Sequence, residues 1–137
     1  MESIIQEHNI KIFCGSTDDI IAEVLTERNS EDAFFIVDIG KVSRQFKKWE
    51  EYLPHVKPYY AIKCNPDPII IKVLAEHGCN FDCASKNEIS SVISAGVSPE
   101  RIIFANPCKM SNQIKYARAV DVDIMTFDSD HELYKIK

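Results

Sequence analysis

Pro58-Tyr59-Tyr60-Ala61-Ile62-Lys63-Cys64-Asn65, an apolar run that ends in a lysine, is the stretch that decides the fold of this chain. A turn signal, Asn-Pro-Asp-Pro, occupies positions 65–68. An apolar run that stops at such a signal predicts a buried strand, here over 58–63. Lys63 would then stand at the mouth of a core, where a lysine amine can serve as a nucleophile. The alternative is a strand-end lysine whose long side chain reaches water.

Composition and charge exclude several classes of protein. The 137 residues are enough for one ordinary domain, and the contents of 45% hydrophobic and 27% charged residues are typical of a globular protein. A net charge of -5 without a basic stripe argues against nucleic-acid binding. No apolar run approaches membrane-spanning length, and Met1-Glu2-Ser3 opens no secretory signal. We therefore expect a cytoplasmic protein without nucleic-acid or membrane partners.

The cysteines point to the same compartment. There are five of them, an odd number, and none forms a Cys-x-x-Cys pair. Four lie in apolar or strand-like surroundings. This pattern predicts reduced thiols, with neither a disulfide framework nor a metal site.

The first part of the chain contains two short strand candidates and two helices. The residues from Ile10 to Phe13 and the apolar run 33–37 are the strand candidates. Ser16 is placed to cap the first helix, and Pro54 ends the second. The apolar positions of the second helix follow the helical repeat, at Val42, Phe46, Trp49 and Leu53.

From position 58 onward a strand and a helix alternate regularly. The predicted strands cover 58–63, 79–84, 101–105 and 124–127. Asp67 and Pro68 open the first of the following helices as cap and first residue. Two capping boxes, Ser85 to Glu88 and Ser129 to Glu132, open later ones. The strand ends fall at intervals of 21, 21 and 22 residues.

This repeat predicts an α/β fold with a parallel sheet covered by helices. No strand is followed by a GxGxxG turn, which favours a barrel over a dinucleotide-binding sheet. A complete eight-stranded barrel takes roughly 250 residues. We therefore expect the N-terminal half of a (β/α)8 TIM barrel, truncated after the fourth strand.

Lys63 and Asp82 form the clearest candidate site. In parallel barrels the reactive groups lie at the carboxyl ends of the strands. Alternation along the second strand puts Asp82 and Ala84 on one face, and Phe81 and Cys83 on the other. A lysine beside a carboxylate on the neighbouring strand suits imine formation with a carbonyl compound. The alternative is an ordinary internal ion pair.

Several ordered motifs carry a resemblance to the N-terminal part of the eukaryotic ornithine decarboxylases. The resemblance is close over 33–137 and loose over the first thirty residues. The motifs are Tyr60-Ala61-Ile62-Lys63-Cys64-Asn65, Phe81-Asp82-Cys83-Ala84-Ser85-Lys86-Asn87-Glu88, Pro99-Glu100-Arg101-Ile102-Ile103-Phe104-Ala105-Asn106-Pro107-Cys108-Lys109, Gln113-Ile114-Lys115-Tyr116-Ala117 and Met125-Thr126-Phe127-Asp128-Ser129.

The resemblance implies a fold-type III enzyme that uses pyridoxal 5'-phosphate. In this family an alanine racemase-like barrel is joined to a β-domain, and the enzyme is a homodimer with active sites at the interface. Residues 1–32 would contribute a strand and a helix to the β-domain. Residues 33–137 would form part of the barrel that binds the cofactor.

The resemblance also assigns roles to individual residues. Lys63 matches the lysine that carries the cofactor covalently, and Asp82 matches the active-site aspartate beside it. Ala61 matches a small residue of the cofactor pocket. Glu88 matches a glutamate near the site, a role that is compatible with its place in a capping box. Three further residues of the family pattern are interpreted as supports for the loops, namely Cys83, Asn106 and Cys108.

The implied activity is decarboxylation of L-ornithine to putrescine in polyamine biosynthesis, with the remaining site residues beyond position 137. We expect the 137-residue chain alone to be inactive. Two alternatives stay open, a related arginine, diaminopimelate or lysine decarboxylase, and a non-catalytic protein like the antizyme inhibitor. Antizyme inhibitors commonly lack the aspartate that Asp82 matches, which favours the enzyme. Residues 109–137 match the family's antizyme-binding segment, with Lys115 at one of its basic positions.

Overall fold

The computed structural model describes residues 11–137, and the chain divides into two compact units, Met1–Asp38 and Ile39–Lys137. The two domains predicted from the sequence, 1–32 and 33–137, stay predictions, because compactness alone does not define the domains of a whole protein. No helix in the described part of the chain is long and apolar enough to cross a membrane.

The first unit contains one helix, α2 (Thr17–Glu27), among its described residues. Its predicted cap is confirmed, because the Ser16 hydroxyl accepts a hydrogen bond from the Asp19 backbone N–H at 3.2 Å. The predicted strand from Ile10 to Phe13 is wrong for residues 11–13, which have no strand structure. Ile10 lies outside the described residues.

The apolar run 33–37 is not a strand either, contrary to our prediction. A strand requires a neighbour that accepts and donates its backbone hydrogen bonds. The described residues offer this run no such partner. The side chain of Phe35 is consequently 95% exposed.

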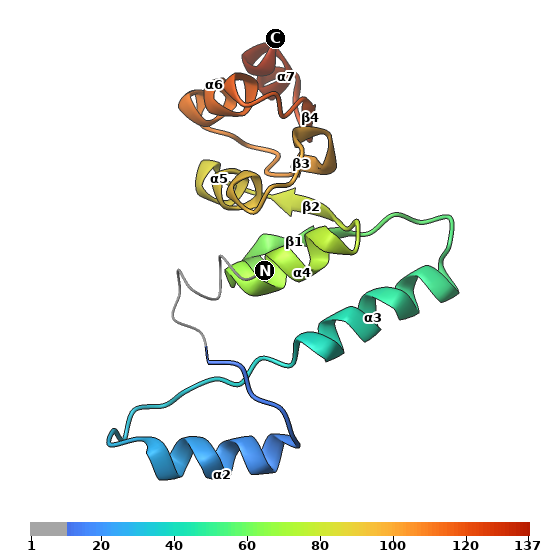
Figure 1. The fold of residues 1–137 in the computed structure, drawn as a ribbon. Helices are drawn as coiled ribbons and strands as arrows, with labels where there is room; N and C mark the ends of the chain where they lie inside the picture. Colours follow the sequence, from blue (N-terminus) through green and yellow to red (C-terminus); the bar gives the residue numbers. More distant parts are fainter. Residues whose placement is uncertain (1–10) are drawn as a thin grey trace. The chain divides into compact units, whose positions relative to one another are not determined.

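The second unit begins with α3 (Ile39–Tyr52) and continues as four strands, each followed by a helix (Figure 1). The strands are β1 (Tyr59–Ala61), β2 (Asn80–Cys83), β3 (Ile102–Phe104) and β4 (Ile124–Met125). The helices that follow them are α4 (Pro68–Glu76), α5 (Lys86–Ser94), α6 (Ser111–Ala119) and α7 (Asp130–Ile136). Two short 3-10 helices, η1 (Ile62–Cys64) and η2 (Pro99–Arg101), follow β1 and precede β3.

The sheet is parallel, with the strand order β1-β2-β3-β4. Every ladder joins residues that are 21 positions apart, such as Tyr59 with Asn80 and Phe81 with Ile102. The repeat seen in the sequence is therefore the register of the sheet. It places Ala61, Asp82, Ile103 and Ile124 in one row across the four strands.

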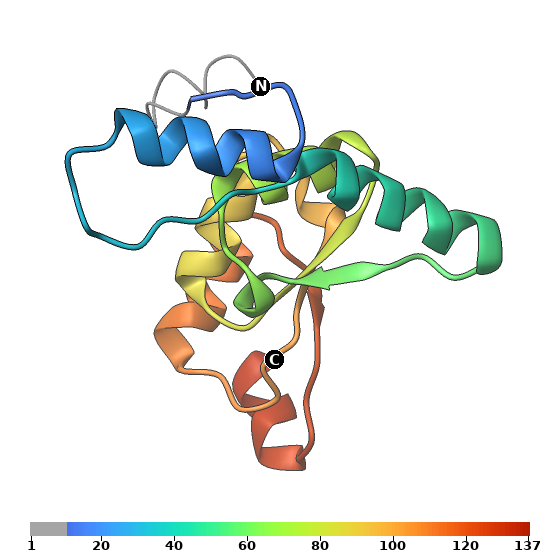
Figure 2. The same cartoon turned by 90° about the horizontal axis from the view of Figure 1, so that it is seen from below.

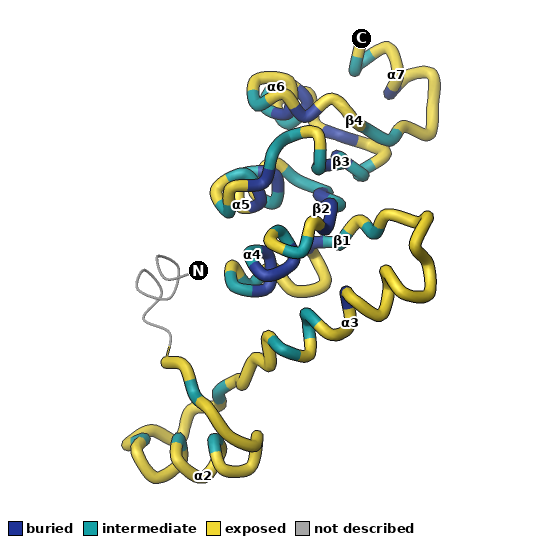
Figure 3. The backbone as a smooth tube through the Cα atoms, turned by 45° about the vertical axis from the view of Figure 1, so that its right-hand side comes forward, coloured by how far each residue is buried: buried dark blue, intermediate teal, exposed yellow. Residues whose placement is uncertain are grey.

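The core lies on one face of this sheet, where α4, α5 and α6 pack (Figure 2). Phe81, Cys83 and Phe104 point to this side and are completely buried. In Figure 3 the buried backbone is concentrated in β2 and in the inner sides of α4 and α5. Asp82 alternates with Phe81 and Cys83 and is only half-buried, as the strand periodicity predicted.

Helix caps in this unit agree with the sequence. The Asp67 carboxylate accepts the N–H of Ile69 at 2.8 Å, and Pro68 is the first residue of α4. Ser85 and Ser129 cap α5 and α7. Gly78 follows α4 with a φ of +85°, a conformation that a side chain would strain.

The predicted end of the first strand is wrong by two residues. β1 stops at Ala61, and Lys63 lies in η1. Ile62, the first residue of this turn, is inserted into the core, where it is only 1% exposed.

We predict that Phe81→Ala lowers the free energy of unfolding by about 3–5 kcal/mol, because it opens a cavity under the central strands. Phe127 is the matched control, since its side chain is 53% exposed. Phe127→Ala should change the free energy by less than about 0.5 kcal/mol. Urea denaturation followed by circular dichroism measures both. Equal effects of the two substitutions would contradict the assignment of the core.

Candidate active site

Lys63 lies beyond the carboxyl end of β1, on the short turn η1, and its side chain is exposed. The turn is held from both sides. Ile62 anchors it in the core, and the Tyr60 hydroxyl donates a hydrogen bond to the Asn65 carbonyl at 3.1 Å. The Asn65 side-chain oxygen in turn accepts the Asp67 N–H at 3.0 Å, which joins the turn to the start of α4. An exposed amine is thus carried by a piece of backbone that hydrogen bonds and core packing hold in place.

Tyr60 is the residue of this turn that the sequence did not indicate. Its ring packs edge-on against Phe81, with 6.5 Å between ring centroids. Burial raises the pKa of Tyr60 to about 12, and the neighbouring Cys64 thiol adds to this shift. The phenol therefore stays protonated at neutral pH, so it can donate the hydrogen bond that closes the turn.

Asp82 lies on the sheet face opposite the helices, directly beside Ala61 of β1. Lys63 follows Ala61 by two residues, so the lysine and the aspartate belong to the same edge of the sheet. Within residues 11–137 the two side chains form no ion pair with each other. The structure thus places Ala61, Lys63 and Asp82 at the same edge of the sheet, without the internal ion pair that was the alternative interpretation.

Glu88 supports the turn after β2. Its backbone N–H donates to the Ser85 hydroxyl at 3.3 Å, as a capping box requires. Its carboxylate, however, accepts the N–H of Ala84 at 2.5 Å, one residue before the position that a capping box would use. Glu88 therefore fixes the backbone two residues beyond Asp82.

A buried ion pair occupies the same edge of the sheet near β3 and β4, and the sequence did not reveal it. The Lys109 ammonium is 3.0 Å from a carboxylate oxygen of Glu132, with the two side chains 0% and 3% exposed. Glu132 also binds Lys135 at 2.5 Å. The hydrogen bond from Lys135 is the main reason why the pKa of Glu132 is lowered to about 2, and Lys109 contributes as well. In the sequence, the Ser129–Glu132 capping box marked this glutamate. The box indicated the helix cap but not the ion pair of Glu132 with Lys109.

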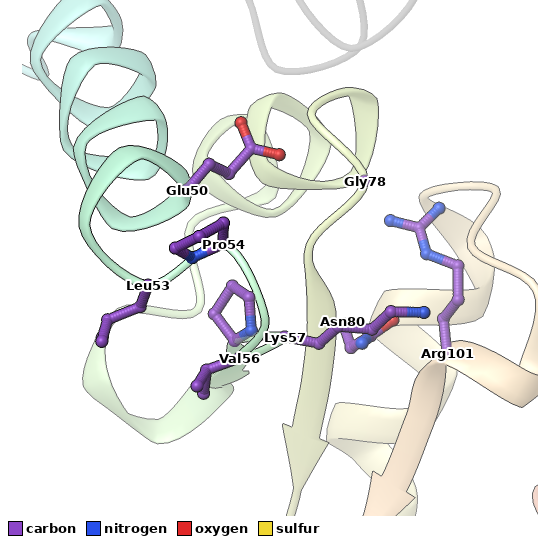
Figure 4. A pocket seen from close by; sticks show the side chains of 9 residues that line it. Glu50, Leu53, Pro54, Val56, Lys57, Gly78, Asn80 and Arg101 are labelled. Atoms are coloured by element: carbon purple, nitrogen blue, oxygen red, sulfur yellow. The ribbon is translucent and has the colours of Figure 1, made fainter.

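A hollow lies at the opposite end of the strands. It measures about 640 Å³ and is lined in part by Lys57, Asn80 and Arg101 (Figure 4). Arg101 is already used there, since its guanidinium donates to the carbonyls of Ala75 at 3.0 Å and Cys79 at 2.5 Å. In parallel barrels the amino ends of the strands serve stability, while the carboxyl ends carry the chemistry. We therefore place the candidate site at the Lys63 edge.

The buried thiols have no part in this candidate site, whereas Cys64 lies in the turn beside Lys63. All five cysteines are free, and Cys79 and Cys83 are buried. Burial raises the pKa of the Cys83 thiol to about 12, so that it remains protonated. Among the described residues no group of three or more histidine, cysteine, aspartate or glutamate side chains could hold a metal ion.

Residues 39–137 match the family described as pyridoxal-dependent decarboxylase, pyridoxal binding domain. The chain belongs to this family. Ornithine decarboxylase of Saccharomyces cerevisiae is 53% identical over 107 residues, which cover 78% of this chain and 23% of the relative. Antizyme inhibitor 2 of Xenopus laevis is 51% identical over 121 residues, which cover 86% and 26%.

The fold of this decarboxylase family member is confirmed by a solved structure. The crystal structure of the Paramecium bursaria Chlorella virus arginine decarboxylase superposes with a TM-score of 0.85 and 38% identity. The match covers 88% of this chain and 32% of the other. The predicted α/β class, with consecutive strand–helix units of a barrel, is therefore correct. The chain spans about a quarter of the length of the curated relatives it matches.

We predict that Tyr60→Phe loosens the turn that carries Lys63. In the folded protein the un-ionised phenol is favoured, so its stabilisation is complete below the ordinary tyrosine pKa of about 10 and is lost as the pH rises toward about 12. The wild-type chain should lose stability in this interval, and Tyr60→Phe should lose less. At neutral pH the substitution should cost about 0.5–1.5 kcal/mol, the usual contribution of one hydrogen bond.

Tyr59 provides the control for this experiment, because it is adjacent and exposed. Tyr59→Phe should leave the pH dependence of unfolding unchanged. If both variants follow the same curve, Tyr60 does not hold the turn.

Proposed function

We propose that this chain forms the cofactor-attachment part of an enzyme that decarboxylates L-ornithine to putrescine with pyridoxal 5'-phosphate. The observation that carries the proposal is the exposed amine of Lys63, held on a fixed turn at the carboxyl edge of a pyridoxal-binding domain. The proposed activity belongs to a polypeptide that has the length of the relatives and so supplies the other side of the site.

The residues at this edge fit the cofactor chemically. Pyridoxal 5'-phosphate, when bound, accepts the electrons that are left when carbon dioxide departs. Within residues 11–137 the Lys63 amine forms no hydrogen bond. It is therefore available for covalent attachment to an aldehyde. Ala61, a residue with a small side chain, lies in the same row as Asp82. Glu88 acts indirectly, by holding the Ala84 N–H.

We propose that Asp82 orients the Lys63 ammonium and exchanges protons with the Lys63 amine. A carboxylate on the same sheet face can attract the Lys63 ammonium and orient it toward the site. The same carboxylate can hold a proton when the amine is released. These are the roles that a half-buried acid beside a nucleophilic amine can perform.

L-Ornithine is the substrate that the similarity favours, since several relatives with this name are 47–53% identical to the chain. Among the solved structures, an arginine decarboxylase is 38% identical and the ornithine decarboxylase from Entamoeba histolytica is 35% identical. The second candidate function is that of a silent antizyme inhibitor, which the Xenopus laevis relative supports. The presence of Asp82 favours the enzyme.

The partners and the location are proposals of the same kind. We propose a homodimer in the cytoplasm, and antizyme as a partner of residues 109–137. The support for antizyme is the likeness to an antizyme inhibitor, which includes 86% of the chain. A pull-down with purified antizyme that retains none of the protein would remove this partner.

A chimera tests the proposed activity. Residues 39–137 would replace the matching segment of the Saccharomyces cerevisiae ornithine decarboxylase, and release of carbon dioxide from ornithine, lysine and arginine would be compared. We expect an active chimera with a preference for ornithine. Lys63→Ala should lower kcat/KM by roughly 10³-fold or more, because the covalent attachment point is lost.

Lys47→Ala is the matched control, because Lys47 lies exposed on α3. It should retain the activity of the chimera. A folded, dimeric chimera without activity on any of the three amino acids would favour the antizyme inhibitor. A Lys63→Ala chimera that keeps full activity would exclude the proposed chemistry altogether.

A further inference from the structure

Lys109 makes contacts that the proposed chemistry does not use. Its ammonium donates to the carbonyl of Asn106 at 3.0 Å and to that of Thr126 at 2.5 Å, and it pairs with Glu132 at 3.0 Å. Its backbone N–H also donates to the Glu132 carboxylate, at 3.1 Å. The Lys109 side chain is completely buried.

The number of contacts matches what a buried ammonium needs. A lysine has three N–H donors and no acceptor, and each donor that stays unpaired in the interior is costly. Lys109 has one acceptor for each donor. These acceptors belong to the loop after β3, to the residue that follows β4 and to α7. One side chain therefore connects three segments that are separate in the sequence.

Asn106 extends these contacts toward the candidate site. Its side-chain amide donates to the Ala84 carbonyl at 3.3 Å, and its oxygen accepts the Cys108 N–H at 3.1 Å. The N–H of Ala84 is held by Glu88 at 2.5 Å. A continuous series of contacts thus runs from α7 to the turn that begins two residues after Asp82.

We propose that Lys109 is a positioning residue, which fixes the loops after β2, β3 and β4 in the arrangement that receives the cofactor beside Lys63. The cofactor part of this inference rests on the proposed function, whereas the mechanical part does not. A lysine that only docks α7 onto the sheet would affect neither the β2–α5 turn nor the chemistry of Lys63.

The first test measures amide hydrogen exchange in Lys109→Met, which keeps the length of the side chain and removes its charge. We expect the Ala84 amide to exchange roughly 10-fold faster, because the Asn106 loop, which binds the carbonyl of the same residue, loses its anchor. The Phe104 amide, inside β3, should be unchanged. Lys47→Met, at an exposed position of α3, is the matched control and should alter neither amide.

The second test measures the rate at which Lys63 becomes attached to an aldehyde, trapped with borohydride and located by peptide mass spectrometry. Two aldehydes are compared, pyridoxal 5'-phosphate and propanal. Lys109→Met should slow the attachment of pyridoxal 5'-phosphate by about 10- to 100-fold, as misplaced binding groups do. Attachment of propanal, which needs no surrounding loops, should change less than twofold. A general loss of structure would change both rates together.

Asn106→Ala keeps the inference testable if Lys109→Met does not fold, because the Asn106 side chain is only half-buried. It should accelerate exchange at Ala84 and leave the Lys109 amide protected. Unchanged exchange at Ala84 in both variants would overturn the inference. If the wild-type chain shows no preference for pyridoxal 5'-phosphate at Lys63, the proposed function fails, and exchange at Ala84 alone decides whether Lys109 positions the turn.

Discussion

The parallel pairing of four strands, each offset by 21 residues from the next, is the constraint on which the rest of the structure depends. Consecutive parallel strands need a crossover connection, which in this chain is a helix each time, so every strand ends at the same edge of the sheet. The residues after the strands are therefore brought together whatever their distance in the sequence. Lys63, Ala84, Asn106 and Thr126 all belong to this edge for that reason.

The same strand pairing puts the core residues and the candidate site residues on opposite faces of the sheet. One face of the sheet carries large side chains such as Phe81 and Phe104, which the helices bury. The other face carries the row of Ala61 and Asp82. Because side chains alternate along a strand, substitutions on one face leave the other face in register. The residues on the candidate-site face can therefore be substituted without disrupting the core on the other face.

Much of this arrangement could be predicted from the sequence, because it depends on local signals. Helix caps such as Asp67 and Ser85 were recognisable, and so was the strand period. Contacts between distant segments could not be predicted. The Lys109–Glu132 pair joins residues that are 23 positions apart, and the helix cap of Ser129 explains the glutamate equally well. The strand predicted at 33–37 failed because pairing, and not apolar character, makes a strand.

The position of Lys63 shows how a small error in the prediction can matter for chemistry. A lysine at the end of a strand would have its backbone fixed by the ladder. In the structure its backbone is fixed by Ile62 in the core and by the Tyr60 hydroxyl, outside the ladder. The amine is consequently exposed and can meet an aldehyde, while the turn beneath it stays in place.

The most direct test of this account is the site at which the cofactor becomes attached. The 137-residue chain would be incubated with pyridoxal 5'-phosphate, reduced with borohydride, digested and analysed by mass spectrometry. We expect the pyridoxyl group on the peptide that contains Lys63, at a ratio of pyridoxal 5'-phosphate to protein that leaves the other lysines unmodified. Modification of another lysine in preference to Lys63 would contradict it.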